Sequence, residues 1–166
     1  MSFLNRVAYQ NKKYRSKIRV RKTGKRRLDM KKNDFLEVKD SKIHRFGCFA
    51  KRRIKKGTVV GEYIGKIIPE SESYLDEDDT EELTYIFDLE NGKVIDATNH
   101  EFPLKYANHS CNPNCEAFQQ EDQVFVEALK DIEPGEEITY DYQLISDDDV
   151  ECRCGSKDCR KVMNRK

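Results

Sequence analysis

The chain has 166 residues, enough for one domain of ordinary size and too few for two large ones. Hydrophobic residues make up 37% of it and charged residues another 37%, so we expect a modest hydrophobic core. No apolar run approaches the ~20 residues that span a bilayer, and the N-terminus lacks the apolar stretch of a secretory signal. We therefore expect no association with a membrane.

The net charge of zero hides a strong asymmetry along the chain. Residues 1–32 contain 13 Lys and Arg and one acid, Asp29, which gives +12, whereas the remaining residues hold 18 bases and 30 acids, which gives −12. We interpret residues 1–33 as a basic, flexible arm that contacts nucleic acid or is read by a nuclear import receptor. The alternative is a solubilising tail without a specific partner.

From Phe35 onward, short β-rich stretches alternate with turns. Asn91-Gly92 predicts a tight hairpin turn. Residues 70–82 hold eight acids and no strand pattern, so we expect an exposed loop or a short helix there. The whole pattern predicts a mainly β domain built from several small sheets. The predicted strands lie within residues 35–41, 58–68, 83–89, 93–98, 123–129 and 134–142.

Three cysteines near the end of the chain have the spacing C-x-C-x4-C. Clustered cysteines without an export signal indicate a metal site before disulfides, and thiolates suit structural zinc, which takes four ligands. Spacing alone does not identify the fourth ligand, although the segment NHSCNPNC is favoured because its Asn-Pro turn can present a cysteine outward. The three clustered cysteines are Cys152, Cys154 and Cys159, and the candidates for the fourth ligand are Cys48, Cys111, Cys115, His44, His100 and His109.

Three strings in this order, YANHSCNPNC, EEITYDY and CRCGSKDC, resemble the SET-domain protein lysine methyltransferases, and GEYIG and VIDAT add to the match. The likeness covers roughly residues 35–164. It is strongest to the mixed-lineage-leukaemia-type histone H3 methyltransferases, and compact microbial SET proteins are also similar.

The resemblance implies the SET-domain fold (β-clip), with small sheets around a knot-like C-terminal segment where the NHS and YDY strings meet. It divides the chain into the arm, a SET domain at residues 34–146 and a post-SET zinc-binding segment at residues 147–166. It also implies that Cys111 completes the zinc site with the three clustered cysteines. Cys48 and Cys115 are then expected to be packing residues.

The implied reaction transfers a methyl group from S-adenosylmethionine to a lysine amine. The resemblance gives Tyr142 the place of the catalytic tyrosine, and Tyr85 and Tyr106 match aromatic positions of the lysine channel. Tyr140 stands where the family has Phe or Tyr, and its hydroxyl is expected to crowd the amine and to hold a water. We therefore expect mainly monomethylation.

Cofactor contacts are implied along the same motifs. Arg45 stands where the family usually has the first glycine of a G-x-G turn, and Lys105 stands where it usually has an arginine, so both departures bear on cofactor affinity. Met163 is expected to cover the adenine. The full set of expected cofactor residues is Arg45, Phe46, Gly47, Tyr63, Lys105, Asn108, His109, Tyr142 and Met163.

The acidic body suits a basic protein substrate, and the resemblance favours a histone tail, with histone H3 ahead of other histones, a ribosomal protein or a lysine of this chain. The arm is then expected to hold nucleosomal DNA or to be methylated itself. We expect a monomer in a nucleus, with a microbial effector in a host nucleus or a bacterial cytoplasmic enzyme as alternatives. The rival hypothesis is a non-catalytic SET-like zinc module that binds peptide or nucleic acid. A zinc-ribbon DNA-binding protein would not explain the TYDY and NHS strings.

Overall fold

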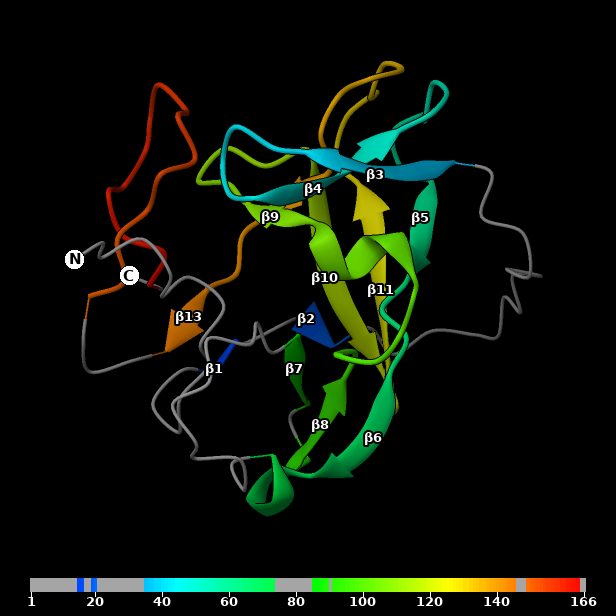
Figure 1. Cartoon of the computed structure of the whole chain (residues 1–166), viewed down its shortest axis with the longest axis vertical. Helices are drawn as coiled ribbons and strands as arrows, with labels where there is room; N and C mark the ends of the chain where they lie inside the picture. Colours follow the sequence, from blue (N-terminus) through cyan, green and yellow to red (C-terminus); the bar gives the residue numbers. More distant parts are fainter. Residues whose placement is uncertain are drawn as a thin grey trace.

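The computed structural model of the chain describes residues 15–16, 19–20, 35–73, 85–89, 91–145 and 149–164. Within these residues the backbone forms five small sheets and two short 3₁₀ helices (Figure 1). The prediction of a mainly β domain of several small sheets is confirmed. No helix in this described part has the length and apolarity needed to cross a bilayer.

The central sheet has the strand order β2-β10-β11-β5. Its main part is an antiparallel hairpin of β10 (Cys115–Gln120) and β11 (Gln123–Ala128), in register from Cys115 opposite Ala128 to Gln120 opposite Gln123. Strand β5 (Val59–Glu62) pairs antiparallel with β11, and β2 (Arg19–Val20) pairs parallel with β10.

Two further sheets lie at opposite ends of this hairpin in Figure 1. At one end, β3 (Leu36–Asp40) pairs antiparallel with β4 (Phe46–Ala50). At the other end, β6 (Lys66–Pro69), β8 (Lys93–Asp96) and β7 (Ile86–Leu89) form an antiparallel sheet, and the 3₁₀ helix η1 (Glu70–Glu72) follows β6.

The predicted hairpin turn at Asn91-Gly92 is confirmed. Gly92 has φ 75°, a left-handed conformation that glycine adopts without a Cβ penalty, and it joins β7 to β8. The predicted strand over residues 58–68 is instead two strands. Gly65 lies between them, and its backbone approaches the Asp96 carbonyl so closely that a Cβ would collide with it.

A sheet of two short strands brings together two of the strings that carry the resemblance. The 3₁₀ helix η2 (Pro103–Tyr106) leads into β9 (Asn108–His109), which pairs parallel with β12 (Thr139–Tyr140). The expectation that the NHS and YDY strings meet is therefore confirmed. Residues 149–164, orange to red in Figure 1, lie beside this sheet, away from the central hairpin.

Two pieces of the basic arm are paired with the body. Strand β1 (Arg15–Ser16) pairs antiparallel with β13 (Leu144–Ile145), and β2 pairs with β10 as described above. At these two places the arm is held by backbone hydrogen bonds. The rest of the arm, residues 74–82 of the acidic segment and residues 83–84 lie outside the described residues.

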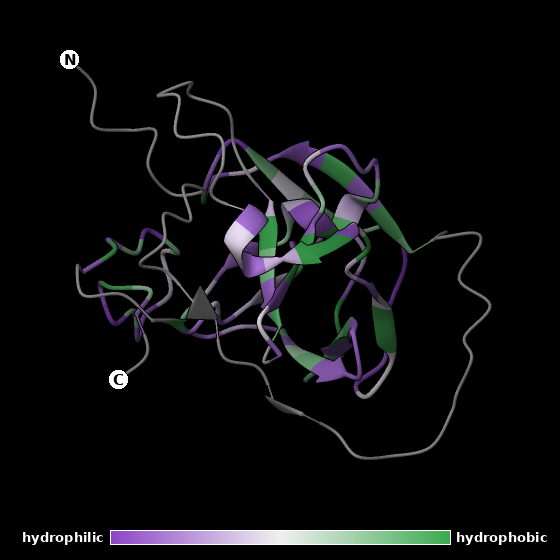
Figure 2. Cartoon of the chain, turned by 90° about the horizontal axis from the view of Figure 1, so that it is seen from below, coloured by the Kyte–Doolittle hydropathy of each residue, from purple (hydrophilic) through white to green (hydrophobic). Residues whose placement is uncertain are grey.

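The hydrophobic core lies between the sheets, where Figure 2 shows the apolar residues concentrated on the strands. Its fully buried members include Ile54, Leu104, Ile132 and Ile138. Cys48 and Cys115 belong to this core with no exposed area, as expected for packing residues. A second, smaller core of Leu144, Cys152 and Met163 joins the C-terminal segment to the body.

Candidate active site

The four cysteines of the expected zinc site come together in the structure. Their Sγ atoms all lie within 4.8 Å of one another, and the Sγ atoms of Cys111 and Cys152 are 3.6 Å apart. A tetrahedron with Zn–S bonds of about 2.3 Å has S···S distances of about 3.8 Å, so this donor set fits a zinc ion. The four cysteines are Cys111, Cys152, Cys154 and Cys159.

Backbone N–H groups surround the sulfur atoms of this cluster. Arg160 N–H donates to Cys111 Sγ at 3.4 Å, and Lys161 N–H donates to Cys159 Sγ at 3.4 Å. Burial opposes ionisation of Cys154, but hydrogen bonds from the Cys111 N–H and from Ser156 lower the pKa of its thiol to about 6. Such donors stabilise thiolates, the form that binds a metal. The cluster therefore joins the C-terminal segment to Cys111, which lies two residues after the end of β9.

His109 lies between the cysteine cluster and the YDY string. Its Nδ1 accepts the Tyr142 N–H at 3.1 Å, so in the neutral ring the proton is on Nε2, which lies 3.4 Å from Cys111 Sγ. Burial lowers the pKa of His109 to about 4; Asp141 opposes this shift and Arg160 adds to it. The imidazole is therefore neutral near pH 7 and acts as a fixed link, not as a catalytic base.

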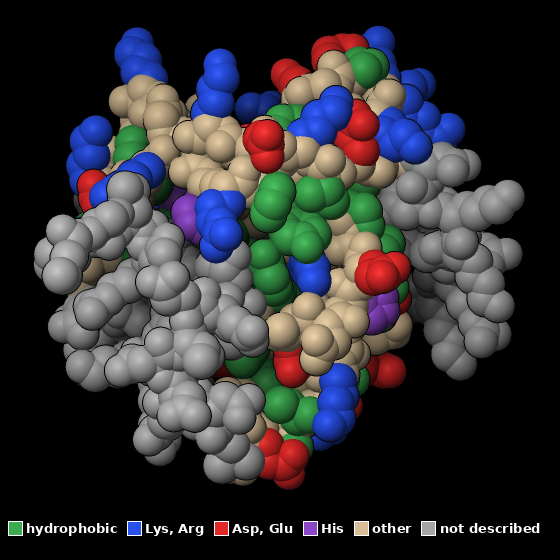
Figure 3. Space-filling model, viewed as in Figure 1, with side chains coloured by type: hydrophobic (Ala, Val, Ile, Leu, Met, Phe, Trp, Pro, Cys, Tyr) green, Lys and Arg blue, Asp and Glu red, His purple; other side chains and the backbone are tan. Residues whose placement is uncertain are grey.

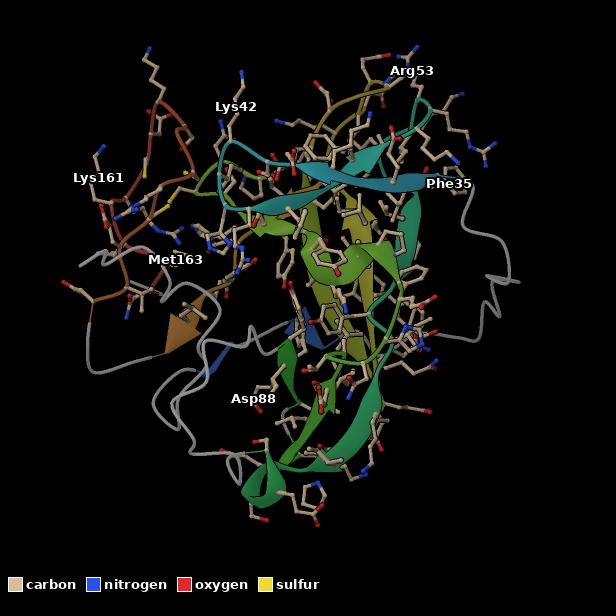
Figure 4. The ribbon with its side chains drawn as sticks, viewed as in Figure 1. Phe35, Lys42, Arg53, Asp88, Lys161 and Met163 are labelled. Carbon is tan, nitrogen blue, oxygen red and sulfur yellow. The ribbon has the colours of Figure 1, made fainter. Side chains whose placement is uncertain are left out.

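A cavity of about 560 Å³ lies beside this link, and five of the expected cofactor residues line it. The loop of residues 41–45 forms one wall, and residues 151–154 of the C-terminal segment form another. Figure 4 shows Lys42 and Met163 on the same side of the molecule. Among the side chains that line the cavity, basic groups outnumber the one carboxylate. This balance of charge suits a ligand with an anionic end. The five expected residues are Arg45, Asn108, His109, Tyr142 and Met163.

A hydrogen-bond network around Glu137 holds the cavity wall, and the sequence reasoning missed this residue. The Glu137 carboxylate accepts the Ser41 hydroxyl at 2.8 and 3.0 Å and the Asn108 amide at 2.7 Å. The same amide also donates to the Phe46 carbonyl at 3.0 Å. Glu137 lies in the quoted string EEITYDY, whose second glutamate was the available signal. The network explains the glycine at position 47, since a Cβ there would collide with the carboxylate.

The predicted channel tyrosines form two pairs of rings on the same hydrophobic core, and we call the four residues the aromatic group. The ring centroids of Tyr140 and Tyr142 are 4.9 Å apart, and those of Tyr85 and Tyr106 are 5.3 Å apart. The Tyr142 hydroxyl donates to the Ala107 carbonyl at 2.8 Å. Burial raises the pKa of Tyr140 and Tyr142 well above the usual value, so both phenols remain neutral hydrogen-bonding groups.

The other four expected cofactor residues lie outside the lining of the cavity. The side chain of Phe46 is exposed and packs edge-on against Tyr106. Figure 3 shows apolar side chains gathered in the middle of the face that is seen in Figure 1. Tyr63 is buried against Phe87, with ring centroids 5.1 Å apart. Lys105 donates to the carbonyls of residues 97 and 98 and lies over the rings of two channel tyrosines. Gly47 packs over Glu137. Their contribution to cofactor binding stays a prediction.

A family model described as the SET domain matches residues 45–143, more than half of the chain. The chain belongs to the SET-domain family. The small sheets described above are therefore its SET fold, and the cluster of four cysteines is compatible with a post-SET zinc site.

This SET domain is similar to curated proteins named as histone-lysine N-methyltransferases. It is 40% identical over 148 residues to human histone-lysine N-methyltransferase 2D, which covers 83% of this chain and 3% of the human protein. It is 37% identical over 134 residues to the Drosophila melanogaster protein trr, covering 75% of this chain and 6% of the relative. Rice TRX1 is 35% identical over 168 residues, covering 95% of this chain and 15% of the relative. The chain thus spans a small part of the length of these relatives.

Proposed function

We propose that the chain is an S-adenosylmethionine-dependent protein lysine N-methyltransferase. The observation that carries this proposal is that Tyr142 contributes both to the lining of the cavity and to the aromatic group. It lines the cavity that Asn108 and His109 also line, and it packs against Tyr140 in the aromatic group. A methyl donor in the cavity and a lysine among the phenols would therefore meet at Tyr142.

S-adenosylmethionine would supply a methyl group on a positively charged sulfur. The N–C bond to lysine forms as the C–S bond breaks, and this in-line displacement needs a neutral amine and close alignment. Lysine has a pKa of about 10.4 in water. The buried aromatic group favours the uncharged amine by desolvation, and the phenol of Tyr142 can orient it. Neutral phenols and a neutral His109 mean that no described side chain here is poised as a strong base, so this site works through alignment and desolvation.

The extent of methylation follows from Tyr140 in this proposal. Its buried, neutral hydroxyl occupies space beside Tyr142 that a methylated amine would need, and it can keep a water there. The main product is therefore monomethyl-lysine. Replacement by phenylalanine removes the hydroxyl and leaves the ring, so Tyr140→Phe is expected to move the product toward dimethyl- and trimethyl-lysine.

The proposed substrate is a histone tail, with histone H3 favoured. The relatives are named as histone-lysine N-methyltransferases, and the acidic balance of residues 33–166 attracts a basic peptide. A nuclear location fits this substrate, and the basic arm would contact nucleosomal DNA.

The proposed division of the chain is an arm at residues 1–33, a SET domain at 34–146 and a post-SET segment at 147–166.

The test combines cofactor binding with methyl transfer. Calorimetry should give saturable binding of S-adenosylmethionine, and mass spectrometry of core histones after incubation should show monomethylation. Tyr142→Phe is the control, because it preserves the ring and removes the hydroxyl. Cofactor binding without transfer to any histone or other basic protein would favour the non-catalytic module instead. A mainly trimethylated product would refute the role given to Tyr140.

A further inference from the structure

The best-sheltered ion pair among the described residues joins the C-terminal segment to the YDY string. Arg160 Nη1 lies 2.6 Å from Asp141 Oδ2 and Nη2 lies 2.8 Å from Oδ1, which is a bidentate contact. The two side chains are 23% and 21% exposed, whereas the Arg side chains of the Arg53 and Arg153 pairs are 58% and 46% exposed. Exposed pairs contribute little, so this sheltered pair is the one expected to matter.

Arg160 touches the cysteine cluster with its backbone and Asp141 of the YDY string with its side chain. It directly follows Cys159, and its N–H donates to Cys111 Sγ at 3.4 Å. Its partner Asp141 directly precedes Tyr142. Any shift of the cluster is therefore passed through Arg160 to the backbone that carries Tyr142.

His109 connects Cys111 with residues 141–142, so that these contacts and those of Arg160 form a closed path. Its Nδ1 accepts the Tyr142 N–H and lies 3.5 Å from Asp141 Oδ1, and its Nε2 faces Cys111 Sγ. The imidazole ring of His109 lies edge-on to the Tyr142 ring, with centroids 5.4 Å apart. The contacts thus run from Cys111 to His109, to residues 141–142, to Arg160 and back to Cys111.

We propose that Arg160 is a positioning residue that couples the post-SET cysteine cluster to the cofactor cavity. By binding both oxygens of Asp141, it keeps this carboxylate from accepting a proton from His109 Nδ1, and so it preserves the Nε2–H tautomer and the position of Tyr142. Its function is to hold the C-terminal wall of the cavity, which includes Cys152, Cys154 and Met163, closed against the wall formed by β9. This inference rests on the proposed function for the identity of the ligand.

The test uses the full, zinc-loaded chain with Arg160→Gln and Arg160→Lys. Arg53→Gln is the matched control, because Arg53 also pairs with carboxylates and lies at the far end of the β3-β4 hairpin from Met163 (Figure 4). S-adenosylmethionine affinity is measured by calorimetry, zinc content by mass spectrometry, and the His109 tautomer by ¹⁵N NMR of the imidazole. Lysine keeps the charge without the bidentate geometry, so it should restore only part of the effect.

We expect Arg160→Gln to retain one zinc per chain, because its N–H contact to Cys111 is a backbone contact. Cofactor affinity should fall about tenfold, which corresponds to about 1.4 kcal/mol, because the bidentate contact no longer holds the C-terminal wall of the cavity. His109 should lose its single Nε2–H tautomer, and Arg160→Lys should lie between the two. Wild-type affinity with an unchanged His109 signal in Arg160→Gln would overturn the proposal.

A second variant guards against misfolding. Asp141→Asn removes the same pairing from the other side, so cofactor affinity should fall to a similar extent. The Nε2–H tautomer of His109 should persist in this variant, because no carboxylate then faces Nδ1. The double variant should be no weaker than the worse single variant, and additive losses would contradict the coupling. If the wild-type chain binds no S-adenosylmethionine, the proposed function fails, and the His109 spectra of the variants still decide whether Arg160 positions this ring.

Discussion

Replacing Glu137 with alanine should destabilise the chain and open the cofactor cavity. The carboxylate accepts the Ser41 hydroxyl and the Asn108 amide at 2.7–3.0 Å. Ser41 also accepts the Ile43 N–H and so shapes the loop that forms one wall of the cavity. The substitution leaves the Ser41 hydroxyl without its acceptor and removes one of the acceptors of the Asn108 amide.

A hydrogen bond to a charged group contributes about 1.5–3 kcal/mol. Since Glu137 is only partly buried, the lower value applies to each of its two partners, which gives a loss of about 3 kcal/mol in the free energy of unfolding. For a chain of this size, a loss of that order lowers the melting temperature by roughly 6–12 °C. Affinity for S-adenosylmethionine should fall as well, because Asn108 lines the cavity.

Urea denaturation and calorimetry measure the two effects. Glu136→Ala is the matched control, because the Glu136 carboxylate is exposed and, within the described part of the chain, accepts only the Glu133 N–H of its own turn. The free energy of unfolding of this variant should change by about 0.5 kcal/mol or less. Glu137→Gln keeps one acceptor oxygen for Asn108 and should lose about 1 kcal/mol. If Glu137→Ala unfolds within about 0.5 kcal/mol of the wild type, the role assigned to this network is refuted.

Three further predictions concern the same site. Gly47→Ala places a Cβ against the Glu137 carboxylate and 2.9 Å from Phe49, and it should cost about 1–3 kcal/mol in urea denaturation, less in the Glu137→Ala background. Tyr142→Phe loses its hydrogen bond to the Ala107 carbonyl and should lower the rate of radiolabelled methyl transfer by roughly 100-fold or more, while the chain stays folded by circular dichroism. Stripping zinc with a chelator should abolish S-adenosylmethionine binding in calorimetry, and added zinc should restore it; unchanged binding would show that the cysteine cluster does not hold the cavity wall.

The sequence predicted most of the strands because their residues alternate or are β-branched. Strand β4 was missed because Phe46–Ala50 contains Gly47 and other small residues. Its sequence does not alternate between polar and apolar residues, as a half-buried strand would. Strand β10 was missed because Cys115–Gln120 has no β-branched residue, and its pairing with β11 makes it a strand.

The amino-acid sequence indicated which chemistry to expect, because cysteine spacing and ordered strings are local properties of the chain. Spacing indicated three of the four cysteines that meet within 4.8 Å, and the resemblance to the SET-domain family indicated the fourth, together with the NHS and YDY strings that pair as β9 and β12. Only the tertiary structure decided which side chains line the cavity. It placed Tyr63 and Lys105 elsewhere and revealed the contacts of Glu137 and Arg160. Contacts between residues 19 to 96 positions apart depend on how the sheets pack, and spacing along the chain carries no information about that packing.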